Sequence, residues 1–234
     1  MALYTISDLH LPLGVNKPMD IFGSEWDNYV NRLAANWQNT VKPDDYVVLA
    51  GDFSWATYIE QAKPDFDFLN NLNGIKFLLK GNHDYWWTTK KKLDEFITKN
   101  NFSDIHFIQN NSYLYKDIAI CGSRLWQYPE GANETEENVR IYNREICRLE
   151  LSLNEAMKLS SKEIILFTHY PPITQSKTYN AFTELISKYP VSDCIYGHLH
   201  AASQKKAAEG TYNNVNYTLA SCDYRHFMPI KLRD

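Results

Sequence analysis

The sequence Gly81-Asn82-His83-Asp84 follows the apolar run 75–79 and the single Lys80. The glycine allows a sharp turn where the strand predicted for this run ends. The amide, imidazole and carboxylate that follow supply a potential metal ligand, an acid or base, and a group able to orient the imidazole ring. Ordinary turns use the same residue types, so the tetrapeptide alone does not distinguish a turn from a functional site. The rest of the chain has to decide between the two.

Four further apolar runs of the chain end in polar residues of the same kind. These runs and the residues after them are 3–6 with Asp8 and His10, 46–49 with Asp52, 163–167 with His169, and 193–196 with His198 and His200. In an α/β sheet the loops at the carboxyl ends of the strands converge over a rigid base. We therefore expect these side chains to meet in one site.

The segments between these runs predict helices and a change of architecture in the middle of the chain. Helical periodicity is found at 24–37, at 56–72 with a break near Pro64, from Thr88 or Thr89, at 135–159 and at 181–188. Short alternating segments at 105–108, 112–115 and 118–121 predict antiparallel strands rather than further βαβ units. Residues 212–220 are predicted as one strand.

Size, composition and charge set limits on the class of protein. The 234 residues, 44% of them hydrophobic and 22% charged, predict one globular domain over 1–234, because no linker interrupts the chain. Within it, 122–160 is predicted as a loop-plus-helix insertion that borders the active site. The formal charge of −4 argues against nucleic acid as a general partner. We expect no membrane association and a cytoplasmic location, because no signal peptide, spanning segment or C-x-x-C pair is found.

Five motifs in this order give the chain its resemblance to a known family. They are Asp8-Leu9-His10, Gly51-Asp52, Gly81-Asn82-His83-Asp84, His169 and Gly197-His198-Leu199-His200. The chain resembles the calcineurin-like metallophosphoesterases, whose motifs run D-x-H, G-D, G-N-H-D or G-N-H-E, an isolated His and G-H-x-H. The resemblance implies an α/β fold with α+β-like character, a four-layer sandwich in which two mixed β-sheets pack face to face with helices on the outside.

Carried over residue by residue, the resemblance implies two metal sites and a catalytic pair. One metal would be held by Asp8, His10, Asp52 and His200, and the other by Asp52, Asn82, His169 and His198, with Asp52 as the bridge. His83 would protonate the leaving group or stabilise its developing charge, and Asp84 would orient the His83 ring. For Asp84, simple capping of the local backbone remains an alternative.

The charge balance of such a site agrees with phosphoester hydrolysis. Two divalent ions bring four positive charges, and Asp8 and Asp52 return two negative ones, so the site keeps a surplus that attracts phosphate. The same surplus lowers the pKa of a shared water, and the resemblance implies attack by a metal-bridging hydroxide on a small phosphomonoester or phosphodiester. Mixed nitrogen and oxygen ligands suit Mn, Fe or Zn, and the sequence does not choose among these divalent or trivalent ions.

Departures from the family pattern argue against two kinds of relative. The protein phosphatases extend the second motif to G-D-x-x-D, whereas Trp55 occupies that fifth position, and they tend to carry Glu where Asp84 stands. The lipid A pathway's UDP-diacylglucosamine hydrolases, which share a similar first motif, have Arg in place of His83. A Ser/Thr protein phosphatase and a lipid A enzyme are therefore both disfavoured.

Substrate contacts and alternative functions stay open at the level of sequence. Arg124 is a candidate substrate-binding residue, whereas Arg140, Arg144 and Arg148 fit a solvated helix stripe better than a phosphate-binding lid. A scaffold that binds a protein partner without catalysis is one alternative, but scaffold members lose ligands that this chain retains. Nuclease activity is another, and the acidic net charge does not favour it. The sequence indicates no oligomeric state.

Overall fold

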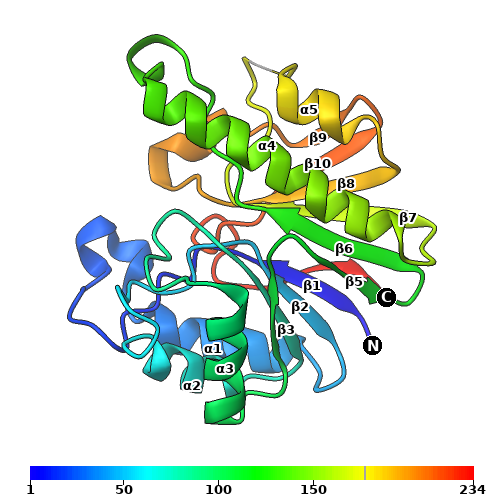
Figure 1. Cartoon of the computed structure of the whole chain (residues 1–234). Helices are drawn as coiled ribbons and strands as arrows, with labels where there is room; N and C mark the ends of the chain where they lie inside the picture. Colours follow the sequence, from blue (N-terminus) through cyan, green and yellow to red (C-terminus); the bar gives the residue numbers. More distant parts are fainter. Residues whose placement is uncertain (177) are drawn as a thin grey trace.

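The computed structural model describes residues 1–176 and 178–234, in which two mixed β-sheets pack against each other (Figure 1). The five-stranded sheet has the order β11-β1-β2-β3-β4 and the six-stranded sheet the order β5-β6-β7-β8-β10-β9. The strands are β1 (Leu3–Ile6), β2 (Tyr46–Leu49), β3 (Ile75–Leu79), β4 (Ile105–Ile108), β5 (Ser112–Tyr115), β6 (Ile118–Ser123), β7 (Glu163–Thr168), β8 (Val191–Tyr196), β9 (Gly210–Tyr212), β10 (Val215–Leu219) and β11 (Ile230–Arg233).

Helices cover the outer face of each sheet (Figure 1). The α-helices are α1 (Tyr29–Thr40), α2 (Lys63–Asn70), α3 (Lys90–Asn100), α4 (Glu136–Met157) and α5 (Ala181–Ile186), and the 3-10 turns are η1 (Asp20–Phe22), η2 (Ser24–Trp26), η3 (Gly131–Asn133) and η4 (Ala201–Lys206). Helices α1, α2 and α3 lie on the five-stranded sheet, and α4 and α5 on the six-stranded sheet. The predicted four-layer sandwich is confirmed.

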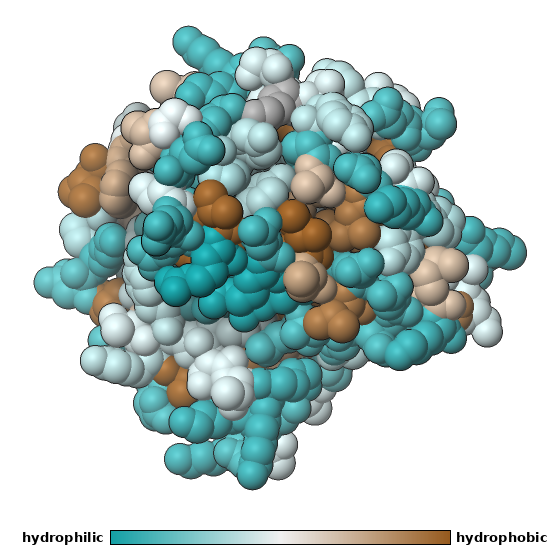
Figure 2. Space-filling model, turned by 45° about the horizontal axis from the view of Figure 1, so that its top comes forward, coloured by the Kyte–Doolittle hydropathy of each residue, from teal (hydrophilic) through white to brown (hydrophobic). Residues whose placement is uncertain are grey.

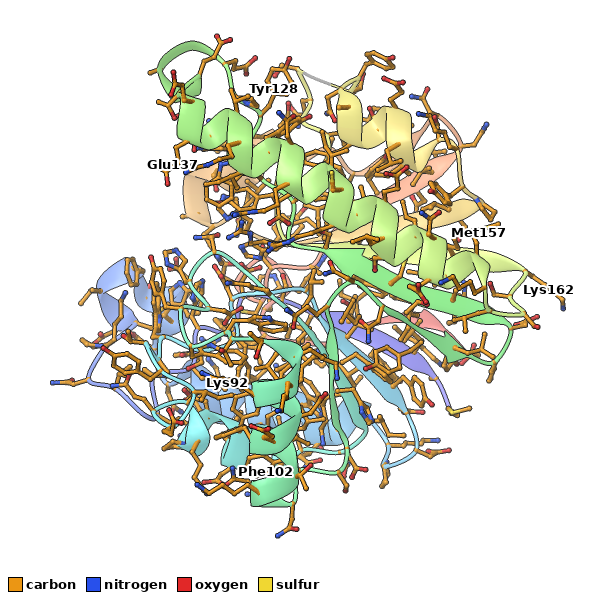
Figure 3. All side chains as sticks on the ribbon, in the orientation of Figure 1. Lys92, Phe102, Tyr128, Glu137, Met157 and Lys162 are labelled. Atoms are coloured by element: carbon orange, nitrogen blue, oxygen red, sulfur yellow. The ribbon has the colours of Figure 1, made fainter. Side chains whose placement is uncertain are left out.

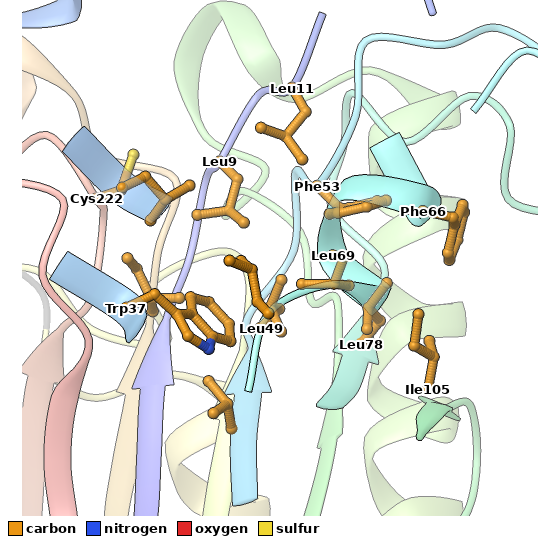
Figure 4. Packing of buried hydrophobic residues seen from close by; sticks show 14 of the residues in the cluster. Leu9, Leu11, Trp37, Leu49, Phe53, Phe66, Leu69, Leu78, Ile105 and Cys222 are labelled. Atoms are coloured by element: carbon orange, nitrogen blue, oxygen red, sulfur yellow. The ribbon is translucent and has the colours of Figure 1, made fainter. Parts of the chain in front are cut away.

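Three hydrophobic clusters hold the layers together. Trp37 of α1 is fully buried among leucines of the β1 and β2 strand ends, and the surrounding cluster joins the first three α-helices to their sheet (Figure 4). A second cluster joins α4 and α5 to the six-stranded sheet. A third contains Leu3 and Val48 from one sheet and Ile165 and Ile195 from the other, so it is the contact between the sheets. Burial of apolar area on this scale is the main stabilising term of the fold.

Four parallel strands in each sheet direct their carboxyl ends to the same edge. In the five-stranded sheet β1, β2, β3 and β4 are parallel, and in the six-stranded sheet β6, β7, β8 and β10 are parallel. The remaining strands β11, β5 and β9 pair antiparallel at the sheet edges. Residues that follow the parallel strands therefore collect along one side of the sandwich.

The middle of the chain corrects one sequence prediction. Strand β4 pairs in parallel with β3, because α3 forms a βαβ crossover between them, so the expectation of three antiparallel strands was wrong for 105–108. The antiparallel pair is β5 with β6, joined by the two-residue turn Lys116-Asp117, in which Lys116 has a φ of 51°. Helix α4 then returns the chain from β6 to the parallel strand β7, so 122–160 contains a crossover connection.

The C-terminal region also differs from its prediction. Residues 210–219 form the hairpin β9–β10 instead of one strand, because Asn213 and Asn214 have φ values of 48° and 64° and turn the chain back. The following chain crosses to the other sheet, where β11 pairs antiparallel with β1 (Figure 1). At the start of the chain, helix α1 begins at Tyr29, five residues after the predicted start, and only a 3-10 turn covers Ser24–Trp26.

The surface view in Figure 2 is mainly hydrophilic, with small separate hydrophobic patches. A search of residues 1–176 and 178–234 finds no helix whose length and apolar character suffice to cross a bilayer. On the long helix α4, Leu149 and Leu153 are buried in the cluster that joins this helix to the six-stranded sheet, whereas Val139 is exposed.

Candidate metal centre

The predicted ligand residues meet where β1, β2, β3, β7 and β8 end. Asp8 is fully buried, and its carboxylate oxygen Oδ1 lies 3.3 Å from His200 Nε2 and 3.9 Å from His169 Nδ1. His10 Nε2 lies 3.3 Å from His200 Nε2 and 3.7 Å from Asp52 Oδ2. Side chains from distant parts of the sequence thus converge on one point.

The ligand atoms form two neighbouring groups that are each suited to a cation. Asp8, His10 and His200 each offer one atom to the first group, and Asp8, Asp52 and His169 to the second, with all atoms in a group within 4.8 Å of one another. Asp52 Oδ2 lies 3.7 Å from His10 Nε2 and 3.4 Å from His169 Nε2, so one carboxylate oxygen lies between the two groups. This position agrees with the predicted bridging role of Asp52.

Asn82 and His198 lie beside the second group. Asn82 Oδ1 is 2.7 Å from His169 Nε2 and 2.8 Å from His198 Nδ1. The backbone N–H of His198 donates to both carboxylate oxygens of Asp8 at 3.0 Å, which links the β8 end to the β1 end. All seven predicted ligands are therefore in one cluster, and the mixture of imidazole nitrogens with carboxylate and amide oxygens fits transition-metal ions.

The backbone at these strand ends is held in an unusual conformation. Asp8, His10, Asp52 and His198 have φ values of 61°, 47°, 52° and 72°, in the left-handed region that non-glycine residues rarely adopt. Each such residue costs about 1–3 kcal/mol, and clusters of them are typical of functional sites. The strained backbone conformations therefore direct these side chains toward one point.

Glycines of the motifs make room for the ligands. A Cβ atom on Gly81 would lie 2.0 Å from Asp52 Oδ1, and one on Gly197 would lie 2.4 Å from Asp8 Oδ2. Gly51 has a φ of 98°, and its Cβ would lie 2.5 Å from His169 Nδ1. Side chains at these positions would push the carboxylates and the imidazole away from one another, which explains the glycine in each motif.

Two of the histidines are oriented through their second ring nitrogen. His169 Nδ1 lies 3.1 Å from the carbonyl oxygen of Ala50, and His200 Nδ1 lies 3.0 Å from Asp223 Oδ1. Such contacts fix the ring tautomer with the hydrogen on Nδ1. In both cases Nε2 points into the cluster, and it offers a lone pair to a metal ion once the ring has lost its second proton.

The carboxylates also set the protonation of these two rings. Burial opposes a charge on His200, but Asp8 and Asp223 outweigh it and raise the pKa of His200 to about 10. Burial likewise opposes a charge on His169, and Asp52 and Asp8 raise its pKa to about 9. A metal ion that binds these rings therefore has to displace protons.

The other two rings behave in the opposite way. Burial lowers the pKa of His10 to about 4, and burial together with the charge of His169 lowers the pKa of His198 to about 3. Both rings are neutral at neutral pH and present lone pairs without loss of a proton. Metal binding would therefore release a proton from His169 and His200 but not from His10 and His198.

Asp84 lies behind the site and does not contact the His83 ring. Its carboxylate accepts hydrogen bonds from the backbone N–H groups of Asp52, Phe53, Ser54 and Gly81 at 2.7–3.3 Å and from Trp86 Nε1 at 3.0 Å. The expectation that Asp84 orients the His83 ring is therefore not met. The carboxylate instead joins two ligand loops, because the turn at Gly81 directs it inward, below His83.

His83 is half-buried at the mouth of the cluster. Its backbone N–H donates to Asp52 Oδ1 at 2.7 Å, and its ring packs on Trp55 with a centroid distance of 4.6 Å. Burial lowers the pKa of the ring. The ring faces an apolar cavity of about 250 Å³ lined by His10, Met19, Phe22, Trp26, Trp55, His83, His200, Ala201 and Asp223. This cavity is the aromatic cavity of the site.

Arg124 follows β6, and its backbone is bonded to the chain that follows His169. Its carbonyl oxygen accepts from the backbone N–H of Tyr170 at 2.9 Å, and Tyr170 packs on His198 with a centroid distance of 4.0 Å. Its guanidinium stacks over Trp126 and pairs with the buried Glu145. Of the predicted arginine stripe, Arg140 and Arg144 are exposed, and Arg148 joins Arg124 at Glu145.

Three further residues support the ligands and were missed in the sequence. Asp223 orients His200, and Ser7 and Ser221 both donate hydroxyl hydrogen bonds to Asp8 Oδ2. Ser221 and Asp223 follow β10, whose carboxyl end lies at the same edge as the other ligand strands. The strand-end signal that located the ligands therefore applies to Asp223 as well, because this residue follows the segment predicted as the last strand.

Comparisons with known proteins agree with this geometry. A model of the family described as calcineurin-like phosphoesterase matches residues 1–202. Among solved structures, the phosphopantetheinyl hydrolase PptH of Mycobacterium tuberculosis is 16% identical with a TM-score of 0.60, covering 99% of this chain and 95% of its own. The protein of unknown function AQ665 from Aquifex aeolicus is 18% identical with a TM-score of 0.51, covering 98% and 95%.

TT1561 of Thermus thermophilus is 12% identical with a TM-score of 0.54, covering 99% of this chain and 97% of its own. At these identities the solved structures show a shared fold alone. A search of curated proteins found no match. The family match extends over all five motifs and over the residues that form the two ligand groups. The chain therefore belongs to the calcineurin-like phosphoesterase family.

Proposed function

We propose that the protein is a di-metal phosphoesterase that hydrolyses a small phosphomonoester or phosphodiester. The observation that supports this most strongly is the pair of ligand groups that lie side by side, with Asp52 Oδ2 between His10 and His169. Family membership supports the same reaction class. A binding scaffold is less well supported, because the ligand positions and His83 are all present.

The residues at hand would hold two metal ions, which we propose are Mn, Fe or Zn. Asp8, His10, Asp52 and His200 would bind one ion, and Asp52, Asn82, His169 and His198 the other. Two bound ions supply a water of lowered pKa and positive charge next to the phosphoryl oxygens. The protein contributes the fixed positions, through the strained strand ends and the glycines beside them.

We propose that His83 donates a proton to the leaving oxygen of the ester. Its backbone is tied to Asp52, so the ring moves with the ligand cluster, and the packing on Trp55 limits its rotation. The lowered pKa makes the protonated ring a stronger acid. Asp84 supports this arrangement from behind as a positioning residue, because it holds the backbone of Asp52 and Gly81 together.

The aromatic cavity gives the leaving group a place beside His83. Its lining is mainly apolar and includes Trp26 and Trp55, and such surfaces favour an apolar or planar group. We therefore expect aryl esters to be accepted as test substrates.

The experiment is a comparison of p-nitrophenyl phosphate and bis(p-nitrophenyl) phosphate with protein that has been stripped of metal and then supplied with Mn. We expect Mn-dependent release of nitrophenol from one of the two esters. The substitution His83→Ala should lower kcat about 10²–10⁴-fold for butyl phosphate, whose leaving alkoxide needs a proton, and much less for the p-nitrophenyl esters, whose leaving group departs as the anion. His226→Ala, an exposed histidine outside the cluster, is the matched control and should retain activity.

The outcome that would reject this function is equally specific. Protein that binds Mn but turns over neither ester would be a metal-binding scaffold.

A further inference from the structure

A second cavity lies beside the metal centre. It is polar, unlike the aromatic cavity, and we call it the cationic cavity. It has a volume of about 370 Å³ and lies among the carboxyl ends of β3, β4 and β6 and the middle of α4. Its lining consists of Leu79, Lys80, Trp87, Thr88, Thr89, Ile108, Gln109, Asn110, Gly122, Ser123, Arg124, Glu145 and Arg148. The family motifs use none of these residues.

The charges in this cavity are unbalanced. Glu145 has a side chain that is 1% exposed, and its Oε1 lies 3.0 Å from Arg124 Nη2 and 2.7 Å from Arg148 Nη1. Its other oxygen accepts from Ser123 Oγ at 3.1 Å. One carboxylate thus serves two arginines, and Lys80 adds a third cation to the lining. The lining keeps an excess of two positive charges, which a phosphate dianion would neutralise.

Two donor groups of the lining residues have no partner within the described residues. The Lys80 ammonium is half-buried, and no hydrogen bond or ion pair involves it in 1–176 or 178–234. Arg124 Nε is buried and also lacks a hydrogen-bond partner there. Buried donors are normally satisfied, because an unpaired one costs about 1–3 kcal/mol and a charged one more. An anion in the cavity would give the Lys80 ammonium a partner.

The cationic cavity and the metal centre share a wall. Lys80 directly precedes Gly81 and Asn82, and the Arg124 carbonyl accepts from Tyr170, the residue after His169. The strands that carry Ser123 and Thr168 are paired at these very residues, so Arg124 and His169 leave neighbouring strands side by side. The two places are therefore neighbours along the strand ends, as a small molecule that carries two phosphates requires.

We propose that the cationic cavity binds a second phosphate group of the substrate, so that the natural substrate carries two phosphates and loses the one at the metal centre. The identity of the substrate in this inference rests on the proposed function. The binding of phosphate in the cationic cavity does not depend on it. Arg124 is then the substrate-binding residue that the sequence suggested, and Lys80 and Arg148 act with it.

The first test measures how many inorganic phosphate ions the Mn-loaded protein binds, by equilibrium dialysis at low ionic strength. We expect two per chain, one at the metals and one in the cationic cavity. Lys80→Gln should leave one, and Asp52→Ala, which removes the metal centre, should also leave one. Lys162→Gln is the matched control, because this lysine is 83% exposed and lies beyond the C-terminal end of α4 (Figure 3).

The second test compares hydrolysis of butyl phosphate with that of ethanediol, butanediol and hexanediol bisphosphates. At least one bisphosphate should have a kcat/KM about tenfold or more above that of butyl phosphate, as expected for a new charge-assisted contact. Lys80→Gln and Arg148→Gln should abolish this advantage through KM, and Lys162→Gln should keep it.

The two inferences fail in different ways. A single phosphate per wild-type chain that is insensitive to Lys80→Gln, or a bisphosphate advantage that survives both substitutions, overturns the cationic cavity as a phosphate site. The opposite result is also informative. If the protein binds two phosphates, loses one of them on Lys80→Gln and hydrolyses none of the esters, the phosphate site is supported and the proposed reaction is rejected.

Discussion

The metal centre and the cationic cavity lie side by side at the same edge of the sandwich, yet they are built differently. The centre places short side chains on strained strand ends, with glycines that leave no space for a Cβ. The cavity is lined by the long side chains of Lys80, Arg124 and Arg148, which come from a strand end, a loop and a helix. The backbone sets the geometry of the metal centre. In the cationic cavity, long flexible side chains surround the buried Glu145 carboxylate.

This difference teaches where changes in the sequence are tolerated. A metal pair requires ligand atoms at defined positions, and the backbone supplies them through conformations that few substitutions allow. Recognition of a second anion needs positive charge and donors, which several side-chain positions can supply. We therefore expect steep effects of single substitutions at the metal centre and graded effects in the cationic cavity.

The largest expected effect is that of Asp52→Ala. Asp52 Oδ2 lies between His10 and His169, so its loss removes a ligand from both groups. Several kcal/mol of transition-state stabilisation depend on the metals, which corresponds to a loss of about 10³-fold or more in kcat/KM. Elemental analysis should show a fall from about two metal equivalents per chain. Unchanged, tightly bound metal in this variant would remove Asp52 from the bridging position.

A second steep effect is expected at Gly81. A Cβ there would lie 2.0 Å from Asp52 Oδ1 and 2.2 Å from the Asp52 backbone nitrogen, so Gly81→Ala must displace a ligand loop. Overpacking of this kind costs about 1–3 kcal/mol of stability, and we expect metal affinity to fall about tenfold or more. Gly131→Ala is the comparison variant, because its Cβ meets nothing within 4 Å, so any cost there comes from its φ of 56° and not from a contact. Equal metal affinity in the two variants would contradict a spatial role for Gly81.

Asp223 supports the metal centre from outside, and its substitution should have an intermediate effect. Asp223→Asn removes the carboxylate that orients His200, and we expect metal affinity to fall about 10–100-fold. Asp223 also helps raise the pKa of His200 to about 10, so wild-type metal affinity should rise with pH up to that value as the competing proton leaves. In the variant the rise should end at lower pH. Titration of Mn binding from about pH 6 to about pH 10 separates this from simple misfolding, which would not move the profile.

The sequence predicted the metal centre better than its surroundings, for a physical reason. Short apolar runs show where a strand must end, and parallel strands of one sheet end at the same edge, so Asp52 and His169 could be placed together without knowledge of the packing. Asp223 obeys the same rule but follows a hairpin that was taken for one strand. Strand β4 was predicted as a strand, but its pairing was predicted as antiparallel. The sequence of a short edge strand carries no signal for the direction of its partner.

The cationic cavity could not be predicted, because its residues come from separate elements with no common period. Lys80, Arg124 and Arg148 meet only after β3, β6 and α4 have packed, and nothing in the sequence shows that Glu145 turns inward. On a helix, Arg148 and Glu145 are i,i+3 neighbours that ordinarily form a solvated pair. Only the packing of α4 on the sheet buries the Glu145 carboxylate and leaves the positive charges of Lys80, Arg124 and Arg148 in excess.

The smallest expected effect is that of Arg148→Gln in this cavity, and Arg124→Gln is its comparison. The Arg148 side chain is 42% exposed, so Arg148→Gln should lower the free energy of unfolding by about 1 kcal/mol or less, because a partly exposed ion pair adds little. The Arg124 side chain is only 14% exposed, and Arg124→Gln leaves Glu145 with its exposed partner alone, so a loss of about 3 kcal/mol is expected. Urea unfolding of both variants gives the two values. Equal losses would mean that Arg148 stabilises Glu145 as much as Arg124 does, despite the greater exposure of its side chain.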